Sequence, residues 1–557
     1  MSTLSQKIEQ RTARVVVIGI GYVGLPLVVE FARAGFRVTG YDKDPGKVQR
    51  FNEGDSYIED IPSSVLGPLV KEGRADATTD TAVLAQADAV IVCVPTPLNK
   101  TKEPDISYIL SATEEIARHQ HKDMLIVLES TTYPGTTREV LVPPLTRGFA
   151  LGQDVFVCFS PERVDPGNKH FGTRNTPKVL GGSTPGCLAV GQALYSKIID
   201  HVVPVSSTDT AEMVKLLENT FRAVNIGLVN EVAQFSRGLG IDPFEVIRAA
   251  ATKPFGFMPF FPGPGLGGHC IPIDPLYLSW KLRALKVQAK FIDLADEVNS
   301  SMPEYVVGRV VDALNDRKKP LNGSRVLVAG IAYKKNITDV RESPAFDIIA
   351  GLDRRGARVS YTDPYAPEVH EHGVHLKGVD PGGSFADYDA VVIVTDHDSF
   401  DYKRMAREAQ LIIDTRDVMR HHTHDRHNIV GLLPPAHLDN QGRLRRASSA
   451  PASASSPAPP RPPRPCPCAH PPSSVVDPSF SSRSPRSPLP PCPAPPPPAP
   501  ASPPASAAPA ASPLSYSGCS GPSMVDPPPH PSSPGKSIFP SPSLSRKSIQ
   551  SVFFPPN

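Results

Sequence analysis

The sequence has no apolar run long enough to cross a bilayer as a helix, and its first residues, Met1 to Gln10, are polar. A helical span needs about 20 mostly apolar residues, and a secretory signal needs an apolar stretch near its start, so neither is expected. The formal net charge of +2 supplies no strong field to attract nucleic acid or an anionic membrane. These absences predict a cytoplasmic protein with no nucleic-acid or membrane partner.

Cysteine is scarce in the part of the chain that shows secondary-structure patterns. That part holds four of the eight cysteines, namely Cys93, Cys158, Cys187 and Cys270. Their spacing does not resemble a secretory disulfide framework, and the spacing of Cys466 and Cys468 is wrong for zinc. His269 has no second metal-type residue at a typical distance along the chain. No metal site is therefore expected.

Proline is abundant, with 65 residues, and it is concentrated near the end. Residues 440–557 are dominated by Pro, Ser and Ala, without hydrophobic periodicity. Such a composition cannot bury enough apolar surface to offset the entropy of ordering the chain, so this tail is predicted to be disordered. It is open whether its PxxP segments bind a partner module, or whether it is an unstructured appendage or a frame-shifted coding end. The residues before it suffice for two or three domains.

A glycine-rich turn lies near the start of the chain. Residues 14–18 form a β-branched run typical of a buried strand, and Gly19 to Gly24, in the pattern GxGxxG, lead into a helical pattern. A second predicted strand, 36–41, ends at an acid, Asp42, at the expected distance of about 20 residues. The glycines let the backbone approach a pyrophosphate, while Asp42 binds ribose hydroxyls and repels a 2′-phosphate, a repulsion that Lys43 could soften. This pattern favours NAD over NADP.

Further short runs predict more strands of one parallel sheet. They are residues 89–94, 124–128 and 155–159. The loops that follow them contain Thr96, Thr131 and Glu162. Ligands of open α/β sheets bind beyond the carboxyl ends of the strands, so these loops are expected to face cofactor and substrate. Taken singly, each residue is equally typical of an ordinary turn.

A long helix is predicted from Asp209 to beyond Asn230, with Thr208 or Asp209 as its cap. Lys215 and Asn219 are four residues apart and therefore share one face. Spacing alone leaves two interpretations open. The pair forms either a solvated polar stripe or, because its flanks are apolar, a general base and oxyanion stabiliser.

Cys270 ends the glycine-rich stretch 263–270, and Asp274 follows four residues later. Most cysteines are inert buried residues, which is what we expect of Cys93 and Cys158 inside predicted strands. The loop position and the following acid favour a nucleophile at Cys270. A covalent nucleophile beside a hydride acceptor predicts an enzyme that oxidises an alcohol twice, with the aldehyde held on sulfur in between.

Taken together, the motifs of the chain carry a family resemblance. In order they are GIGYVGLPL, VPTP, ESTTYPGTT, SPERVDPGN, KLLENTFRAVNIGLVNE, GPGLGGHCIPIDP, AYKKNITDVRESPA and DTRDVM. They resemble the UDP-glucose/GDP-mannose dehydrogenase family over about residues 10 to 435. The resemblance implies an α/β fold with two Rossmann-like domains, 10–205 and 321–435, joined by a helical region, 206–305, that forms a dimer. The whole enzyme is then expected to be a homodimer or a higher homo-oligomer. Predicted strands at 325–330, 389–394 and 411–413 agree with the second domain.

The resemblance also implies roles for individual residues. The implied catalytic residues are Cys270 as nucleophile, Lys215 and Asn219 around the C6 oxygen, Asp274 as the carboxylate that orients water or lysine, and Glu162 and Thr131 in thioester hydrolysis and proton handling. The implied NAD-binding residues are Gly19, Gly21, Tyr22, Val23, Gly24, Asp42, Thr96, Thr131 and Arg341. The implied UDP-sugar-binding residues are Arg163, Phe260, Gly265, Lys334 and Arg416.

Departures from the UDP-glucose enzymes of the family bear on the substrate. Arg163, Val164 and Asp165 replace a loop that contains Phe-Leu, while Ile273 and Glu129 stand where those enzymes usually or often carry lysine. These departures favour a UDP-N-acetylhexosamine, first of all UDP-N-acetylglucosamine. The expected reaction is an NAD-dependent four-electron oxidation at C6 that feeds surface-polysaccharide synthesis, with UDP-glucose as the alternative substrate.

Two other classes of protein stay open. A two-electron 2-hydroxyacid-type dehydrogenase shares the first domain and the Lys–Asn pair, but it lacks a nucleophilic cysteine and a third domain. A non-catalytic nucleotide-binding scaffold has no need of Cys270, Lys215 or Asn219.

Overall fold

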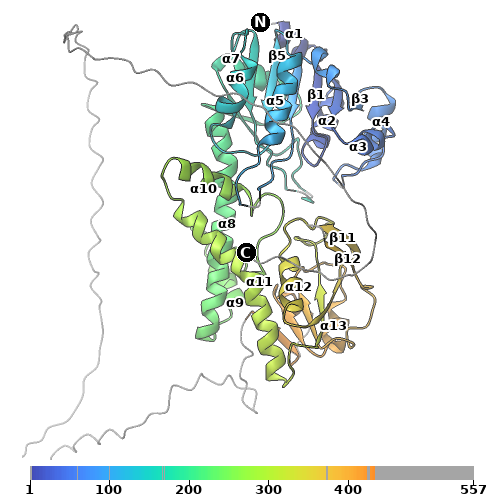
Figure 1. Ribbon diagram of the computed structural model, residues 1–557, viewed down its shortest axis with the longest axis vertical. Coiled ribbons are helices and arrows are strands. Elements are labelled where there is room, and N and C mark those ends of the chain that lie inside the picture. The colour runs from blue at the N-terminus through green and yellow to red at the C-terminus, as the bar shows by residue number, and fades with distance from the viewer. Residues whose placement is uncertain are drawn as a thin grey trace, which may run out of the picture. The chain divides into compact units, whose positions relative to one another are not determined.

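The chain folds around two separate sheets, with long helices between them in sequence (Figure 1). The structure is a computed structural model that describes residues 3–432, apart from residues 59, 100, 166, 169, 372–373 and 423–426. The predicted disordered tail, 440–557, lies outside the described residues.

The first sheet has eight strands in the order β3-β2-β1-β4-β5-β6-β7-β8. The strands are β1 (Arg14–Ile18), β2 (Arg37–Tyr41), β3 (Ala75–Thr78), β4 (Ala89–Val92), β5 (Met124–Leu128), β6 (Val155–Phe159), β7 (Lys178–Gly182) and β8 (Val202–Val205). All neighbours are parallel except β6 and β7, which pair antiparallel. Each predicted strand of this domain is present, shorter by one or two residues where the ends differ.

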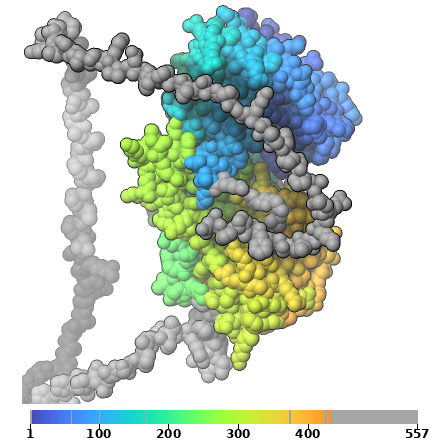
Figure 2. Space-filling model, in the orientation of Figure 1, coloured from blue at the N-terminus to red at the C-terminus, as the bar shows by residue number. Residues whose placement is uncertain are grey.

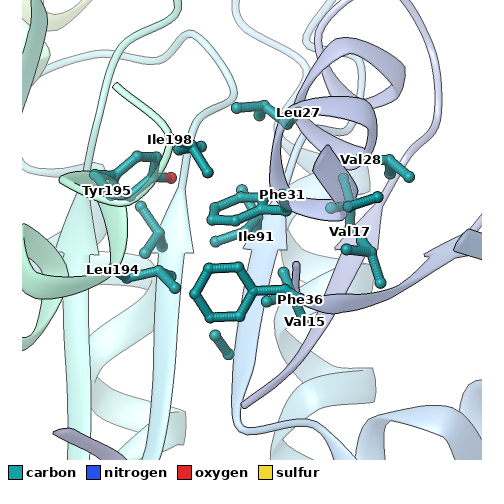
Figure 3. Packing of buried hydrophobic residues seen from close by; sticks show 14 of the residues in the cluster. Val15, Val17, Leu27, Val28, Phe31, Phe36, Ile91, Leu194, Tyr195 and Ile198 are labelled. Atoms are coloured by element: carbon teal, nitrogen blue, oxygen red, sulfur yellow. The ribbon is translucent and has the colours of Figure 1, made fainter. Parts of the chain in front are cut away.

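Helices cover both faces of this sheet. They are α1 (Thr3–Glu9), α2 (Gly24–Arg33), α3 (Pro45–Asn52), α4 (Ser63–Lys71), η1 (Thr81–Gln86), α5 (Ser107–His119), η2 (Thr137–Leu141), α6 (Val142–Leu145) and α7 (Pro185–Tyr195). Because side chains alternate along a strand, Val15 and Val17 of β1 enter one core and Val16 enters the other. In the first core, Phe31 of α2 packs against Phe36 and Tyr195 over the sheet, with ring centres 5.9 and 6.1 Å away (Figure 3).

The middle of the chain is helical. Its helices are α8 (Thr208–Leu239), α9 (Pro243–Ala250), α10 (Asp274–Ala284) and α11 (Lys290–Asp316). The predicted caps of α8 were wrong, because the hydroxyl of Ser207 accepts from the N–H of Thr210 at the start of the helix. The helix ends at Gly240 in the left-handed conformation, which glycine adopts without strain. Helix α11 packs along α8 and continues past residue 305.

The second sheet has five parallel strands in the order β10-β9-β13-β14-β15. They are β9 (Arg325–Ala329), β10 (Arg358–Thr362), β13 (Ala390–Ile393), β14 (Ile412–Asp414) and β15 (Ile429–Gly431). The other elements are α12 (Pro344–Asp353), the hairpin strands β11 (Glu368–Glu371) and β12 (Val374–Lys377), α13 (Tyr402–Glu408) and η3 (Val418–His421). Separate apolar cores fill the two faces. The predicted α/β class with two Rossmann-like sheets is confirmed, while the domain limits given above stay predictions.

Candidate active site

The turn after β1 depends on glycine. Gly19 has a positive φ of 87°, and a Cβ there would lie 2.6 Å from the carbonyl oxygen of Cys93. A Cβ on Gly24 would lie 1.9 Å from the carbonyl oxygen of Gly19. A Cβ on Gly21, by contrast, would meet no atom within 4 Å. Gly21 thus borders open space at the start of α2, where backbone N–H groups and the helix dipole favour the pyrophosphate of a dinucleotide.

Asp42 braces the same turn. Its carboxylate accepts hydrogen bonds from the N–H groups of Ile20, at 3.1 Å, and Asp44, at 3.0 Å. Lys43, which was expected to soften the repulsion by Asp42, donates to a serine hydroxyl of α5, and its effect on that charge stays a prediction. The cation near Asp42 is Lys47, one turn into α3, with its Nζ 3.9 Å from the carboxylate. Asp42 is therefore positioned for ribose hydroxyls, with one lysine able to moderate its charge.

The loops after β4, β5 and β6 emerge at one edge of the sheet, because these strands are parallel neighbours. Thr96 is buried, and its carbonyl oxygen accepts from the hydroxyl of Tyr277 in α10 at 2.8 Å. Thr131 is partly exposed in the loop after β5. Glu162 follows β6, and its carbonyl oxygen is bound by Lys215 at 2.6 Å. These three predicted residues therefore share the edge that carries ligands in open α/β sheets.

The loop that ends at Cys270 packs against the second Rossmann-like domain. The N–H of Gly268 donates to the carbonyl oxygen of Arg341 at 3.0 Å. A Cβ on Gly268, which has a positive φ, would lie 2.8 Å from the ring of Tyr333. Gly265 also has a positive φ, and a Cβ there would come within 3.1 Å of a proline side chain. Glycine thus lets the loop lie against this domain, and Cys270 at its end stays partly exposed.

Helices α8 and α10 bring a lysine, an asparagine and an aspartate to this loop. Lys215 is only 9% exposed, which excludes the interpretation as a solvated stripe. One turn further along α8, Asn219 donates through Nδ2 to Oδ2 of Asp274 at 2.5 Å. The N–H of Asp274 donates to the carbonyl oxygen of Cys270 at 2.8 Å, so one tight turn holds both residues. The structure therefore brings these four predicted residues together.

Burial sets the protonation of this group. It raises the pKa of Asp274 to about 6, against the opposing effects of Lys215 and the Asn219 hydrogen bond. It also raises the pKa of the Cys270 thiol, which Lys215 opposes. Burial acts to lower the pKa of Lys215, but the neighbouring Cys270, Asp274 and Glu162 outweigh it, so the pKa is raised and the ammonium stays charged. At neutral pH the site therefore holds a thiol, an ammonium and a carboxylate able to accept a proton.

Arg341 joins the cofactor turn to the Cys270 loop. Its guanidinium lies 5.1 Å from the ring centre of Tyr22, in the glycine turn, and it binds the carboxylate of Asp339 at 2.6 Å. Its carbonyl oxygen is the acceptor for Gly268. One residue of the second domain thus contacts both the glycine turn and the Cys270 loop.

The residues implied to hold the UDP-sugar lie in two groups. Near the loop after β6, Lys334 lies 3.0 Å from both carboxylate oxygens of Asp165, and Arg163 forms an ion pair with Glu218 of α8 at 2.6 Å. At the start of the Cys270 loop, a Cβ on Gly263 would lie 2.6 Å from the guanidinium of Arg416.

Phe260 precedes Gly263 by three residues and therefore belongs with the group at the start of the Cys270 loop. Its ring packs edge-on against Phe221 of α8, with ring centres 5.8 Å apart. The structure therefore places Arg163 and Lys334 together, and Phe260 and Arg416 along the segment that leads to Gly265.

Sequence reasoning missed a buried charged group beneath Glu162. Lys178 of β7 lies with its Nζ 2.8 Å from Glu129 and 3.3 Å from Glu162, and the hydroxyl of Tyr195 donates to Glu129. The side chain of Glu129 is fully buried and therefore does not face a sugar directly. A lysine at the start of a short apolar strand was the only available signal.

Metal-type ligands come together on the hairpin of β11 and β12. There Glu368, His370 and His375, all exposed, bring ligand atoms within 4.8 Å of one another. The two imidazole rings stack almost parallel at 4.1 Å, so their lone pairs do not converge, and His375 already binds Glu368 at 2.5 Å. We assign no metal to this group.

Comparison with known proteins identifies the chain. Three models of the UDP-glucose/GDP-mannose dehydrogenase family match it in sequence, namely the NAD binding domain at residues 13–199, the central domain at 209–301 and the UDP binding domain at 327–421. The chain belongs to this family. It is therefore an enzyme, an NAD-dependent UDP-sugar dehydrogenase, and the space beside Gly21 with Asp42 fits the cofactor.

The names of two relatives of this dehydrogenase give N-acetylated sugars as their substrates. The UDP-N-acetyl-D-glucosamine 6-dehydrogenase of Pseudomonas aeruginosa is 36% identical over 402 residues, which is 71% of this chain and 92% of that protein. The UDP-N-acetyl-D-mannosamine dehydrogenase of Methanococcus vannielii is 33% identical over 428 residues, 74% of this chain and 95% of that protein.

A solved structure shares the fold of the dehydrogenase. The UDP-D-ManNAc dehydrogenase of Pyrococcus horikoshii has a TM-score of 0.68 at 31% identity, over 75% of this chain and 99% of that one. None of the helices in the described part of the chain combines the length and apolar character of a membrane span.

Proposed function

We propose that this dehydrogenase oxidises the C6 hydroxyl of UDP-N-acetylglucosamine to a carboxylate, with Cys270 as covalent nucleophile. The observation that carries the proposal is the cluster at the end of the glycine-rich loop. It joins a partly exposed thiol to a charged lysine, an amide donor and a carboxylate whose pKa is about 6. The glycine turn and Asp42 would hold NAD, which would supply the hydride acceptor for two successive oxidations.

In the first oxidation the C6 alcohol loses a hydride and a proton and becomes an aldehyde. Lys215 and the amide of Asn219 stabilise the oxygen as negative charge develops on it, which is most effective in a site drier than water. Asp274 takes the proton from Cys270, and the sulfur then bonds to C6. The former carbonyl oxygen receives a proton, and the product is a thiohemiacetal.

In the second oxidation the thiohemiacetal loses a hydride and its hydroxyl proton, which leaves a thioester on Cys270. Water attacks C6, the C–S bond breaks, and the thiol and the sugar carboxylate are released. In this proposal Glu162 and Thr131 position the water and handle its proton. Thr96, Tyr22 and Arg341 hold the nicotinamide half of the cofactor, while Arg163, Phe260, Gly265, Lys334 and Arg416 hold the nucleotide sugar.

The choice of sugar rests on the loop after β6. Arg163 and Asp165 are fixed in it by Glu218 and Lys334, which places polar groups where the UDP-glucose enzymes carry apolar ones. An acetamido group can add hydrogen bonds to these polar groups, which a sugar without it cannot do, so the loop favours the N-acetylated sugar. UDP-N-acetylmannosamine is the second candidate, because relatives of similar identity carry that name.

The enzyme is proposed to work as a homodimer through α8. Five exposed apolar residues lie on this helix, namely Leu217, Phe221, Leu228, Phe235 and Leu239. At 100° per residue they fall within about 40° of one another and nearly opposite Lys215. Leu285, Val287 and Phe291, between the end of α10 and the start of α11, are exposed as well, and the yellow-green part of the chain that contains them lies at the left of the molecule in Figure 2. An apolar stripe of this length needs a partner, and a second copy presents the same stripe.

The test of the reaction is the yield of NADH per sugar. UDP-N-acetylglucosamine, its C2 and C4 epimers and UDP-glucose are each supplied in limiting amount with excess NAD. Two NADH per sugar, with the highest kcat/KM for UDP-N-acetylglucosamine, support the proposal. One NADH per sugar contradicts the thioester route, and a preference for UDP-glucose contradicts only the choice of sugar.

The test of the dimer is the mass in solution. Leu228→Glu is expected to halve the mass measured by light scattering, because it places a charge in the middle of the stripe. Leu110→Glu, at another exposed leucine, on α5, serves as the control and keeps the dimer.

A further inference from the structure

A buried group of four side chains lies behind the proposed active site. Glu129 follows β5, Glu162 follows β6, Lys178 begins β7, and Tyr195 ends α7. The ammonium of Lys178 lies between the two carboxylates, 2.8 Å from Glu129 and 3.3 Å from Glu162. The phenol of Tyr195, a residue labelled in Figure 3, donates to Glu129.

Hydrogen bonds to both of its oxygens hold the carboxylate of Glu162 in place. Its Oε1 accepts from the N–H groups of Arg163 and Val164, each at 2.8 Å, and its Oε2 faces Lys178. Its own carbonyl oxygen accepts from Lys215. The carboxylate therefore cannot turn without breaking a hydrogen bond to the backbone or to the buried ammonium.

Two carboxylates share one ammonium in this group, so their surroundings decide which of them bears the charge. Glu162 has two backbone donors and a second lysine nearby, whereas Glu129 has only the phenol in addition to Lys178. Burial acts to raise the pKa of Glu162, but Lys178 and the backbone donors outweigh it and the pKa is lowered. For Glu129 burial prevails and the pKa is raised. Glu162 therefore loses its proton at a lower pH than Glu129 does.

Other charged or titratable groups face Glu162 from neighbouring elements. Lys215 and Glu218 lie on α8, and Glu218 is already engaged by Arg163. The thiol of Cys93, after β4, lies close to Glu129 and Lys178, and burial raises its pKa well above the ordinary value, so it stays neutral. The ammonium of Lys178 is therefore the main compensating charge that contacts the Glu162 carboxylate itself.

We propose that Lys178 and Glu129 are positioning residues that hold Glu162 ionised and correctly oriented for the release of product from Cys270. This inference rests on the proposed thioester route. Lys178 acts as the counterion, and Glu129, fixed by Tyr195, keeps the ammonium in place from the opposite side.

Stability alone does not account for the arrangement. A buried ion pair contributes little to folding, because the desolvation of the charges offsets their attraction, and well-packed apolar residues do as well. An ammonium placed against the back of a carboxylate at the edge of the site, however, directly favours the ionised form of that carboxylate.

The test uses two substitutions with opposite expected effects. Lys178→Met keeps most of the length of the side chain but removes the charge that stabilises ionised Glu162. The acid limb of the thioester-hydrolysis rate should therefore move to higher pH by about one unit or more. Glu129→Gln leaves Lys178 to Glu162 alone, so the same limb should move to lower pH. Rapid-quench mass spectrometry of the Cys270 acyl group measures this rate across about pH 3 to 9, a range that includes the acid limb of a carboxylate whose pKa is lowered.

Matched variants separate this role from a structural one. Lys178→Arg keeps the cation and should restore the wild-type pH profile. Lys197→Met removes a surface lysine that pairs with Glu9 and should leave the profile unchanged. In a Glu162→Gln background, Lys178→Met should no longer move the limb, because the group that it acts on is gone.

Several outcomes overturn the inference. They are shifts of the same sign in Lys178→Met and Glu129→Gln, an unchanged limb in both, or a shift that persists without Glu162. If Lys178→Met does not fold, Glu129→Gln alone decides, since an unmoved limb there contradicts the proposal. Absence of a Cys270 acyl group in the wild type would instead contradict the proposed function itself, so the two failures are distinguishable.

Discussion

The two Rossmann-like domains begin with the same turn. Gly19 follows β1 and Gly330 follows β9, both have a φ of 87°, and each donates its N–H to the neighbouring strand at 2.8 Å. An acid ends each of those neighbouring strands. Asp42 accepts from the N–H of Ile20, and Asp363 accepts from the N–H groups that follow Gly330. In both domains the acid therefore braces the turn.

The two domains differ in the surroundings of this acid. Beside Asp42 the turn continues to Gly21, which borders open space, and the carboxylate keeps some exposure. Asp363 is fully buried and binds His397 at 2.9 Å. Since the ring Nδ1 of His397 accepts from the N–H of Asn336, its Nε2 carries the hydrogen that is donated to Asp363. The comparison teaches that the acid is first a structural device, and that it can bind a ribose only where the fold leaves it open.

The largest expected effect falls on neither turn but between the domains. Cys270→Ser should lower kcat by about a thousandfold or more, because the hydroxyl is a poorer nucleophile and its ester hydrolyses more slowly. NAD and UDP-sugar should still bind, since the two turns are untouched, and calorimetric titration of each ligand measures this. Loss of NAD binding would mean that the two domains do not divide the ligands as proposed.

The same thiol can be checked chemically. Because burial raises the pKa of Cys270, inactivation by iodoacetamide should be slow at neutral pH and accelerate as pH rises. Substrate should protect, and peptide mapping should find the label on Cys270 and not on buried Cys158. A rate independent of pH above neutrality contradicts this.

Alanine at one glycine of each turn, Gly330 in the second and Gly21 in the first, should give opposite results. Gly330→Ala forces a side chain into a positive φ and to within 2.5 Å of Thr395, so the unfolding free energy should fall by about 2 kcal/mol or more. Gly21→Ala meets no protein atom but enters the proposed pyrophosphate space, so KM for NAD should rise about tenfold with Tm unchanged. Thermal unfolding and initial rates measure both. An equal loss of Tm in the two variants would mean that the turn at Gly21 is no more open than the turn at Gly330.

The pH dependence of activity should come from the cluster around Cys270, between the two domains, and not from Asp42 or Asp363. Burial raises the pKa of Asp274 to about 6, and this group must be ionised to take a proton from the thiol. The rate should therefore fall as pH drops through about 6, by about tenfold per unit at the acid end. Asp274→Asn should abolish this limb together with most of the activity, as kcat measured against pH will show. A limb that survives in this variant belongs to another group.

The smallest expected effect concerns the charge of Asp42, the acid beside the turn that borders open space. Asp42→Asn keeps an acceptor for Ile20 but removes the repulsion of a 2′-phosphate, so the preference for NAD over NADP should narrow by several-fold. Lys47→Met should widen it, since Lys47 is the cation beside Asp42. Asp363→Asn should lower stability without changing the preference, as rates with both cofactors will show.

The open turn could be predicted because its parts are close together in sequence. The strand, the glycines, α2 and Asp42 form one βαβ unit, in which each local pattern agrees with the next. The position of Lys47 could not be predicted, because it depends on where α3 begins and how far one helical turn carries the side chain. The Ser207 cap was missed for a related reason: Ser207, Thr208 and Asp209 all have suitable side chains, and only backbone geometry chooses among them.

The buried group around Lys178 could not be predicted from the sequence, for a different reason. Glu129 and Lys178 are separated along the chain by β6 and meet because β7 pairs antiparallel with β6 and α7 packs against the sheet. No local pattern encodes such a contact. The residues of the catalytic cluster were predictable as residue types, but the raised pKa of Asp274 depends on burial that only the folded chain creates.

Helix α8 carries Lys215 and Asn219 on one face and the exposed apolar stripe on nearly the opposite one. Because each residue turns the helix by about 100°, losing or gaining a single residue between Asn219 and Leu228 would swing the rest of the stripe sideways, out of line with Leu217 and Phe221. Substitutions in α8 alter one contact at a time, whereas a change of its length alters the geometry of both faces at once. We therefore expect insertions and deletions to accumulate in the loops around this helix, and its length to vary little as such enzymes diverge.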